Sequence, residues 1–358
     1  MDPRIWGKLP RELLEHILSF LALKTFLNLR STCKHFNSLI FSPSFISKHS
    51  ASSLPSFLLL SHPQSSQKFS LYDSTLGNWC SSFLWSSQFL PGNSKSSTLL
   101  SISNGLFCLS LPGSFAFLVC NFLTKCSRKI DYPSFPFSFV FLTFVSTGLG
   151  YQIFVTTHST AFLYDSRFHL WRRFRLDAHD LILSDSSYQE GVYFNGSLYF
   201  TVSDSGPFSI LCLNPGNGKL DSQAIDLPEN LTFLRLVSDG ERKLYMVGGV
   251  GTNGISRMMK LWELDGDGEG RKRWIEVGIL PELMCRKFMS VCYHTYEHVY
   301  CLWHRGMICI CCYTWPEILY YKVGRGTWHW LPKCPSLPEK WSCGFRWFSF
   351  LPEISAAV

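Results

Sequence analysis

Charged residues are scarce in this sequence of 358 residues, where Asp, Glu, Lys and Arg together account for 16%. Hydrophobic residues account for 46% and aromatic residues for 16%, a composition that excludes a mostly disordered chain and can fill a sizeable core. The sequence also lacks an apolar run after Met1, so we expect no secretory signal peptide. We therefore expect its 14 cysteines to be reduced thiols in the cytosol or nucleus.

Known catalytic motifs are absent as well. The sequence has no GxSxG nucleophile motif, no glycine-rich phosphate loop and no HExxH motif, so neither a catalytic residue nor a cofactor is predicted. The net charge is +7, with basic clusters at 171–175 and 271–273. Basic residues beside aromatic ones can bind nucleic acid, but the dispersal of charge along the chain favours solvated strands instead. We expect no nucleic-acid partner.

The segment 9–45 has the only helical pattern. One predicted helix carries its apolar residues at three-to-four-residue intervals, namely Leu13, Leu14, Ile17, Leu18 and Leu21. Pro10 suits the first turn of that helix, because its missing N–H would be unpaired there in any case. A second short helix is expected around Phe26, Leu27 and Leu29. A third is expected to begin with Thr32 as its N-cap and to end before Pro43.

So short a helical segment rarely forms a stable core alone, and it has more large apolar residues than its own helices can cover. The excess predicts a surface for a partner. The residues Leu9-Pro10, Leu13-Leu14, Ile17-Leu18, Leu21, Leu29-Arg30 and Cys33-Lys34-His35-Phe36 resemble the F-box, with Phe36 where that family often has Trp. This resemblance implies docking on the Skp-type adaptor of a cullin-based ubiquitin ligase. We predict that the adaptor contacts Leu9, Pro10, Leu13, Leu14, Ile17, Leu18 and Leu21.

Three segments are expected along the chain. Residues 1–46 form the three-helix F-box, and the serine-rich residues 47–56 form a linker. Residues 57–358 form the second domain.

An internal repeat organises this second domain. Each unit has an apolar or aromatic residue, usually followed by Asp or Asn, then a turn, and then a Trp or its substitute about seven residues after the first. The units begin at Tyr72, Cys120, Tyr164, Leu213, Leu264 and Tyr321, and the second landmarks are Trp79, Ser127, Trp171, Leu220, Trp274 and Trp328. The intervals between units are 48, 44, 49, 51 and 57 residues. This period predicts a mainly β fold, a propeller of six blades, with each unit reading as three strands.

The closing strand and the glycines refine this prediction. The segment 345–350 is expected to pair with the first blade and so remove an exposed edge. Val247-Gly248-Gly249, followed by Trp262 and Trp274, resembles a kelch repeat, in which the paired glycines end an inner strand. The chain as a whole therefore resembles plant F-box proteins with kelch-type propellers.

Three further patterns suggest sites that we do not predict. Residues 132–164 contain no Asp, Glu, Lys or Arg, but alternating Phe135, Phe137, Phe139 and Phe141 indicate a strand rather than a membrane span. The spacing from Asp265 to Glu276 is close to a calcium loop, yet a hairpin between strands explains it better. Cys292, His294, His298 and Cys301 are ligand types for zinc, but they lie within an apparent strand, turn and strand, so core thiols and turn histidines are favoured over a metal site.

The functional hypothesis is a non-catalytic substrate receptor of a Skp-cullin-F-box ubiquitin ligase. Its partners would be the adaptor, the cullin scaffold behind it and an unknown protein substrate. Loops near 185–190, 251–256 and 304–307 are expected to select the substrate, although no contact residue can be named. Two alternatives remain open: a propeller enzyme or metabolite-binding module with an F-box-like cap, and an F-box protein that acts outside a cullin complex.

Overall fold

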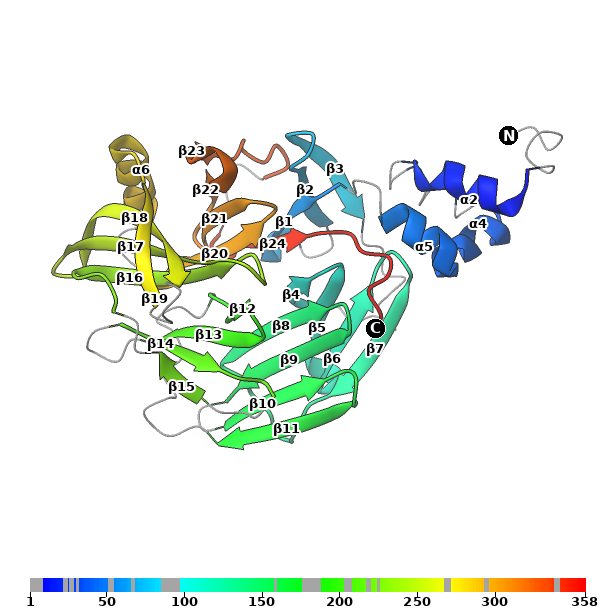
Figure 1. Cartoon of the computed structure of the whole chain (residues 1–358), viewed down its shortest axis with the longest axis horizontal. Helices are drawn as coiled ribbons and strands as arrows, with labels where there is room; N and C mark the ends of the chain where they lie inside the picture. The colour runs from blue at the N-terminus through cyan, green and yellow to red at the C-terminus, as the bar shows by residue number, and fades with distance from the viewer. Residues whose placement is uncertain are drawn as a thin grey trace.

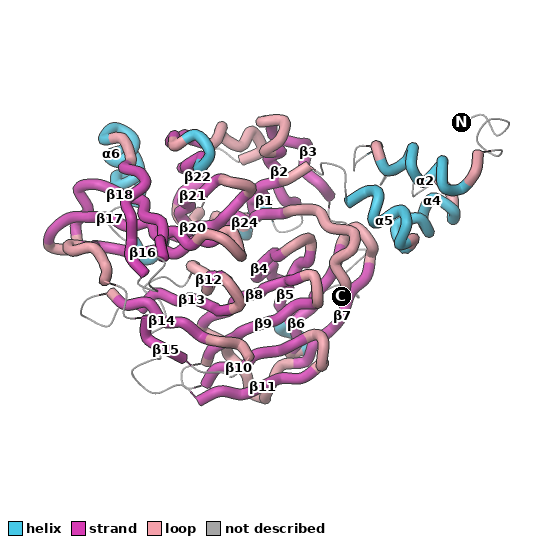
Figure 2. The backbone as a smooth tube through the Cα atoms, in the orientation of Figure 1, coloured by secondary structure: helices cyan, strands magenta, loops and turns pink. Residues whose placement is uncertain are grey.

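The computed structural model contains a group of N-terminal helices and a ring of six β-sheets (Figure 1). It describes residues 9–21, 25, 29, 32–50, 55–65, 68–84, 97–157, 160–175, 188–202, 208–216, 220–223, 226–266, 272–292, 296–337 and 342–358. The tube in Figure 2 shows how little helix the ring contains. Within the described residues, no helix is long and apolar enough to cross a membrane.

The helical part comprises α2 (Arg11–Ser19), α4 (Lys34–Ser38), the 3-10 turn η1 (Leu39–Phe41) and α5 (Pro43–Ser50). The first predicted helix is present, with Pro10 directly before it. The second predicted helix mostly lies outside the described residues, since only Thr25 and Leu29 of it are described, both helical.

The N-cap predicted for the third helix is wrong by one residue. Cys33 caps α4, because its Sγ accepts a hydrogen bond from the Phe36 N–H at 3.4 Å. The Thr32 hydroxyl instead donates to the Leu29 carbonyl at 2.6 Å. Pro43, expected to follow the last helix, begins another one, since proline is well tolerated in a first helical turn. Helix α5 consequently covers residues 47–50, where the sequence suggested a linker.

Six four-stranded antiparallel sheets form the blades of a propeller, which confirms the predicted fold class and blade number. From the channel outward, blade A contains β24 (Arg346–Phe350), β1 (Phe57–Ser61), β2 (Lys68–Asp73) and β3 (Asn78–Leu84). Blade B contains β4 (Thr98–Ser103), β5 (Leu106–Leu111), β6 (Ala116–Asn121) and β7 (Cys126–Asp131). Blade C contains β8 (Phe141–Thr147), β9 (Gly150–Thr156), β10 (Thr160–Asp165) and β11 (Leu170–Arg175).

The other three blades follow the same order. Blade D contains β12 (Val192–Phe194), β13 (Ser197–Val202), β14 (Ser209–Leu213) and β15 (Leu220–Gln223). Blade E contains β16 (Leu231–Ser238), β17 (Leu244–Thr252), β18 (Ile255–Gly266) and β19 (Lys272–Ile279). Blade F contains β20 (Val299–His304), β21 (Met307–Cys312), β22 (Trp315–Lys322) and β23 (Thr327–Trp330).

Ring closure occurs where the sequence predicted it. The last strand, β24, pairs antiparallel with β1, from Phe57 opposite Phe350 to Ser61 opposite Arg346. The chain therefore supplies the innermost strand of blade A from its C-terminal end, so that β1 has no exposed edge on that side.

The repeat read from the sequence is the hairpin of the third and fourth strands of each blade. In every unit the two landmark residues are direct cross-strand partners: Tyr72 and Trp79, Cys120 and Ser127, Tyr164 and Trp171, Leu213 and Leu220, Leu264 and Trp274, and Tyr321 and Trp328. The Asp or Asn then caps the turn, as where Asp73 Oδ1 accepts from the N–H of Thr75 at 2.8 Å. The period thus marks one hairpin of each blade.

Apolar side chains fill the spaces between adjacent blades. Phe107 of β5 contacts Phe350 of β24 with ring centroids 5.1 Å apart. Tyr245 of β17 stacks on Trp303 of β20 at 5.9 Å. Because each blade buries its faces against its neighbours, no blade is expected to be stable alone.

Several local predictions need correction. Each blade has four strands rather than three, because the innermost strands had no landmark residue of their own. Strand β8 begins at Phe141, and the preceding residues 132–140 form an irregular connection, since Pro133 and Pro136 have no N–H for a strand ladder. Gly248 and Gly249 lie inside β17, the second strand of blade E, rather than at the end of an inner strand.

A helix between blades E and F was not predicted. Helix α6 (Glu282–Cys292) buries Cys285, Phe288, Met289 and Cys292. These positions have the three-to-four-residue spacing of an amphipathic helix, so the signal was present in the sequence. The strand expected at Cys292 is therefore wrong.

The two faces of the ring differ because neighbouring strands run in opposite directions. One face carries the turns between first and second and between third and fourth strands, for example Asn104-Gly105 and Arg305-Gly306; we call it the turn face. The other carries the connections between second and third strands and between blades, including residues 132–140 and α6; we call it the loop face. The helical part joins β1 at Phe57, on the turn face, and the chain also leaves β24 there.

Candidate functional site

Helix α2 distributes the residues predicted to contact the adaptor over two faces. Leu14 and Leu18 are buried, with exposed fractions of 8% and 1%, whereas Leu13 is 46% exposed. The outer face carries Pro10, Leu13, Ile17 and Phe20, and the inner side carries Leu14, Leu18 and the half-buried Leu21, while Leu9 lies half-buried before the helix. Phe20, not among the predicted residues, is 71% exposed. The outer stripe is therefore the part available to a partner.

The core beneath α2 is completed by the propeller. Leu14 and Leu18 pack with Leu39, Phe45, Leu123 and Ile354. Leu123 belongs to the turn after β6, and Ile354 to the C-terminal tail, residues 351–358. This contact explains how so few helical residues form a core, because the turn face supplies the missing apolar surface.

Glu15 is a buried polar residue of α2 that sequence analysis missed. Its side chain is 2% exposed, and its carboxylate accepts hydrogen bonds from the hydroxyls of Ser42, at 3.2 Å, and Ser44. These bonds join α2 to the beginning of α5. The one signal in the sequence was that the helical pattern places the charged Glu15 on the apolar, inward face of the helix.

Residues 188–191 cross the central channel. Gln189 donates to the carbonyls of Leu236 on β16 and Cys301 on β20, and its Oε1 accepts from the Cys301 N–H at 2.8 Å. Ser101 Oγ on β4 donates to Glu190 at 2.7 Å, and Arg346 on β24 lies 3.9 Å from the same carboxylate. The Gly191 N–H donates to Thr143 on β8 at 2.9 Å. This segment therefore bonds to the innermost strands of the five other blades before it continues as β12.

The channel consequently offers little room to a ligand. Its polar groups are bonded to one another, and the cavity beside Gln189 and Glu190 has a volume of about 10 Å³. Small-molecule sites typically have volumes of about 300 Å³ or more. The geometry expected of a metabolite-binding channel is not found among the described residues.

The patterns weighed for metals are structural elements where the structure describes them. Asp265 and Arg273 are cross-strand partners, so that segment is the β18–β19 hairpin, as expected. Cys292 ends α6 and Cys301 lies in β20, while His294 lies outside the described residues. Within the described part of the chain, no three His, Cys, Asp or Glu side chains are grouped to hold a metal ion.

The three loops expected to select the substrate do not form one surface. Of residues 185–190, those before 188 lie outside the described residues, and Glu190 faces the channel. Residues 251–256 lie at the loop face, whereas 304–307 lie at the turn face. His304 is fully buried between the hydroxyls of Ser74 and Ser349, each 2.8 Å away, and burial lowers its pKa to about 4. Its role is therefore in packing.

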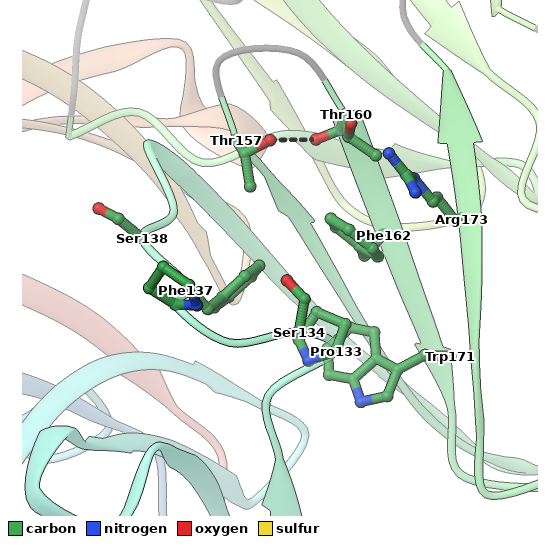
Figure 3. Close-up of a pocket in the computed structure, with 10 residues that line it drawn as sticks. Pro133, Ser134, Phe137, Ser138, Thr157, Thr160, Phe162, Trp171 and Arg173 are labelled. Carbon is green, nitrogen blue, oxygen red and sulfur yellow. Dashed lines mark hydrogen bonds between the residues drawn. The ribbon is translucent and has the colours of Figure 1, made fainter.

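A groove opens on the loop face beside blade C, with a volume of about 510 Å³ (Figure 3). Its lining comes from the connection between blades B and C and from strands β10 and β11, and comprises Pro133, Ser134, Pro136, Phe137, Ser138, Thr157, Thr160, Phe162, Trp171 and Arg173. We call it the blade C groove. No sequence pattern had indicated it.

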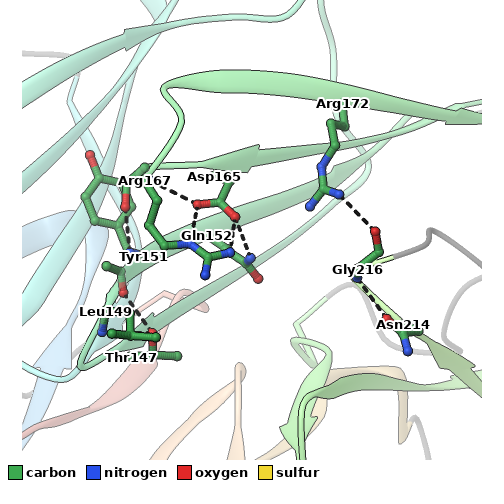
Figure 4. A network of polar contacts seen from close by, with 11 residues as sticks. Thr147, Leu149, Tyr151, Gln152, Asp165, Arg167, Arg172, Asn214 and Gly216 are labelled. Atoms are coloured by element: carbon green, nitrogen blue, oxygen red, sulfur yellow. Dashed lines mark hydrogen bonds and ion pairs between the residues drawn. The ribbon is translucent and has the colours of Figure 1, made fainter.

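On the turn face of the same blade, a polar network fixes the hairpin of β10 and β11 (Figure 4). Asp165 accepts hydrogen bonds from the Arg167 guanidinium at 2.6 and 3.0 Å and from Gln152 at 3.0 Å. The bonds from Arg167 lower the pKa of Asp165 to about 2. This carboxylate is satisfied by neighbouring side chains, so the network stabilises the turn rather than forming a reactive site.

Comparisons with known proteins give matches for the N-terminal helices and for the chain as a whole. Residues 6–48 match the F-box domain family. The sequence is 53% identical to an F-box/kelch-repeat protein of Arabidopsis thaliana, over 100% of this chain and 90% of that protein. It is 28% identical to F-box only protein 6 of the same plant, over 86% of this chain and 65% of that protein, and 26% identical to the protein UNUSUAL FLORAL ORGANS, over 94% and 80%.

Proposed function

Because the chain belongs to the F-box/kelch-repeat family, we propose that it is the substrate-recognition subunit of a Skp-cullin-F-box ubiquitin ligase. In this proposal the F-box helices bind a Skp-type adaptor, and the propeller holds a target protein for ubiquitination. The chain itself catalyses nothing and acts in the cytosol or nucleus. It contributes proximity, since holding a target near the charged ubiquitin carrier raises the effective concentration of its lysines.

The observation that carries the proposal is the outer stripe of α2. Leu13 and Phe20 are 46% and 71% exposed, and Pro10 and Ile17 lie on the same side of the helix. An apolar stripe at this spacing fits a partner that packs against a helix face. The inner residues Leu14 and Leu18 would support docking indirectly, because they hold α2 on the core beneath it.

A binding measurement with a purified Skp-type adaptor tests the proposal. The full chain is expected to bind. The Leu13→Asp variant is expected to bind more weakly by a factor of about ten or more, because the charge would be buried at the contact. Leu13 is suited to this test because it is exposed, whereas Asp at the buried Leu14 would disrupt the helical core itself.

The matched control is Leu149→Asp, the same substitution at a leucine that is 77% exposed in the turn between β8 and β9. It should leave adaptor binding unchanged, and both variants should retain the melting temperature of the parent chain. Absence of binding by the parent chain would overturn the ligase assignment. If Leu13→Asp binds the adaptor as tightly as the parent chain, the outer stripe is not part of the adaptor contact.

A further inference from the structure

The blade C groove has the features of a recognition site for a short protein segment. Phe162, Trp171 and Arg173 project from strands β10 and β11 on one side, and Phe137 of the connecting segment lies on the other side (Figure 3). The rings of Phe137 and Phe162 meet edge to face, with centroids 5.8 Å apart. Aromatic rings, prolines and hydroxyls thus surround a volume of about 510 Å³, within the range of ligand sites. The groove lies on the loop face, away from the F-box helices on the turn face.

The walls of the groove are fixed by bonds within the protein. Trp171 Nε1 donates to the Asp131 carbonyl at 3.0 Å, which ties β11 to blade B. The Thr157 hydroxyl and N–H both donate to the Thr160 carbonyl, at 3.1 and 2.8 Å. A site whose walls are already ordered loses little conformational entropy when a ligand binds.

Two exposed aromatic rings extend the groove. Phe115 and Phe135 are 52% and 74% exposed and contact each other edge to face, with centroids 4.9 Å apart. Phe135 directly precedes the lining residues Pro136 and Phe137. We call this pair the aromatic platform.

The backbone at Phe115 supports a functional role for the platform. Its φ is +48°, a left-handed conformation that bulky side chains rarely adopt. The turn is held by a 3.0 Å bond from the Tyr132 N–H to the Phe115 carbonyl. Because the Phe115 ring is half-exposed, core packing does not explain this costly backbone conformation. Residues with strained backbones cluster at binding sites.

Charge specifies what the groove would bind. Arg173 is the charged residue among the described lining residues, none of which is acidic, and it is exposed. Its guanidinium lies 6.0 Å from the centroid of Phe162, and it forms no ion pair with a described residue. The neighbouring Arg172 points the other way and donates to the Gly216 carbonyl at 3.1 Å (Figure 4). A guanidinium fork with no acidic partner among the described residues, at an uncharged aromatic groove, favours a carboxylate.

We propose that the blade C groove binds an acidic segment of the target protein. A large apolar side chain of that segment would enter the groove, and a neighbouring carboxylate would pair with Arg173. A second apolar residue would contact the aromatic platform. This inference rests on the proposed function, because it names the part of the target that the receptor recognises. Aromatic residues and arginine are the residue types that dominate the energetics of protein interfaces.

A random dodecapeptide phage library, selected on the immobilised full chain, provides the test. Selected peptides should be enriched in Asp or Glu beside a large apolar residue. Synthetic versions of these peptides should bind about tenfold more weakly to Arg173→Gln, since one charge-assisted contact is lost, and Phe135→Ala should also weaken binding. Replacing Glu by Gln in the peptide should weaken binding to the parent chain but have little further effect on Arg173→Gln.

Matched controls are Arg325→Gln and Phe168→Ala, exposed residues of turns on the opposite face. Both should leave peptide binding unchanged, and all four variants should keep adaptor binding, which separates this proposal from the ligase assignment. The proposal is overturned if no peptide is enriched, if the enriched peptides lack acidic residues, or if Arg173→Gln retains the preference for Glu. If a peptide with phosphoserine in place of glutamate binds about tenfold more tightly, the recognised group is not a carboxylate and the proposal is overturned.

Discussion

Glu190 shows how a single residue can link the channel to pH. Its carboxyl accepts from Ser101 and lies 3.9 Å from Arg346, but burial dominates and raises its pKa to about 7. In an unfolded chain the pKa would be near the ordinary value of 4.5. Folding therefore favours the protonated form, so Glu190 stabilises the fold most below about pH 4.5, and this contribution is lost as pH rises through 7.

We predict that Glu190→Gln is more stable than the parent chain at pH 8. The neutral amide can still accept the bond from Ser101 without the cost of desolvating a charge, so the free energy of unfolding at pH 8 should rise by about 1 to 2 kcal/mol, and the difference should nearly vanish at about pH 4. Urea unfolding of both chains at the two pH values measures this. An equal or lower stability of Glu190→Gln at pH 8 would contradict the assignment.

A matched control for that experiment is Glu317→Gln. The Glu317 side chain is 6% exposed and pairs with Lys287 at 2.6 Å and Lys333 at 3.5 Å. Neutralising a carboxylate with such partners leaves them without a counterion, so this substitution should lower the stability at pH 8. The two glutamates therefore predict shifts of opposite sign.

At the scale of elements, the C-terminal tail holds the F-box helices. Asn121 Nδ2 donates to the carbonyls of Glu353 and Ala356 at 2.9 and 3.0 Å, which fixes the tail on the turn after β6. The tail passes so close to Gly105, whose φ is +77°, that a Cβ there would lie 2.7 Å from the Glu353 nitrogen. Ile354, 4% exposed, then packs against Leu14 and Leu18.

We predict that Ile354→Ala loosens the F-box helices while leaving the propeller intact. The substitution leaves a cavity where the isoleucine side chain was, so it should lower the stability of the helical core by about 2 to 4 kcal/mol. Hydrogen exchange should show faster exchange of the α2 amides with unchanged exchange in β5 and β9. Ile279→Ala, at a residue 50% exposed, is the control and should change neither. Unchanged protection of α2 would show that the tail does not support it.

The sequence predicted elements well where the signal was local. Tyr72 and Trp79, or Tyr164 and Trp171, are neighbours across a short turn, so their spacing reports one hairpin directly. The innermost strands carry no such pair. The channel segment could not be predicted either, since Gln189 bonds to Cys301, 112 residues later in the chain. The blade C groove likewise depends on how two blades meet.

Helix α2 shows the same limit within one element. Its spacing predicted both a helix and an apolar face, but the sequence could not tell that Leu14 faces the propeller while Leu13 faces outward. That division depends on Leu123 and Ile354, which come from distant parts of the chain. The F-box residues were therefore assigned together, although the structure gives them different environments.

At the scale of the whole molecule, two consecutive C-terminal segments have separate tasks. Strand β24 closes the ring through its pairing with β1, and residues 351–358 join the ring to the F-box helices. Trp347, Phe348 and Phe350 of β24 are each at most 5% exposed, so they belong to the cores between blades. A large aromatic residue lost from a core costs about 3 to 5 kcal/mol, and the total stability of a domain is about 5 to 15 kcal/mol.

Two truncations should therefore behave differently. A chain that ends at Phe350 retains β24, so its propeller should unfold cooperatively near the parent melting temperature, with only the F-box helices less protected. A chain that ends at Phe345 loses three buried aromatic residues and exposes the edge of β1, so it should fail to form a stable monomer and should aggregate. Circular dichroism melts and size-exclusion chromatography distinguish these outcomes. A stable monomer ending at Phe345 would mean that the other five blades hold the ring without closure, and that the buried surface of β24 contributes far less than its burial implies.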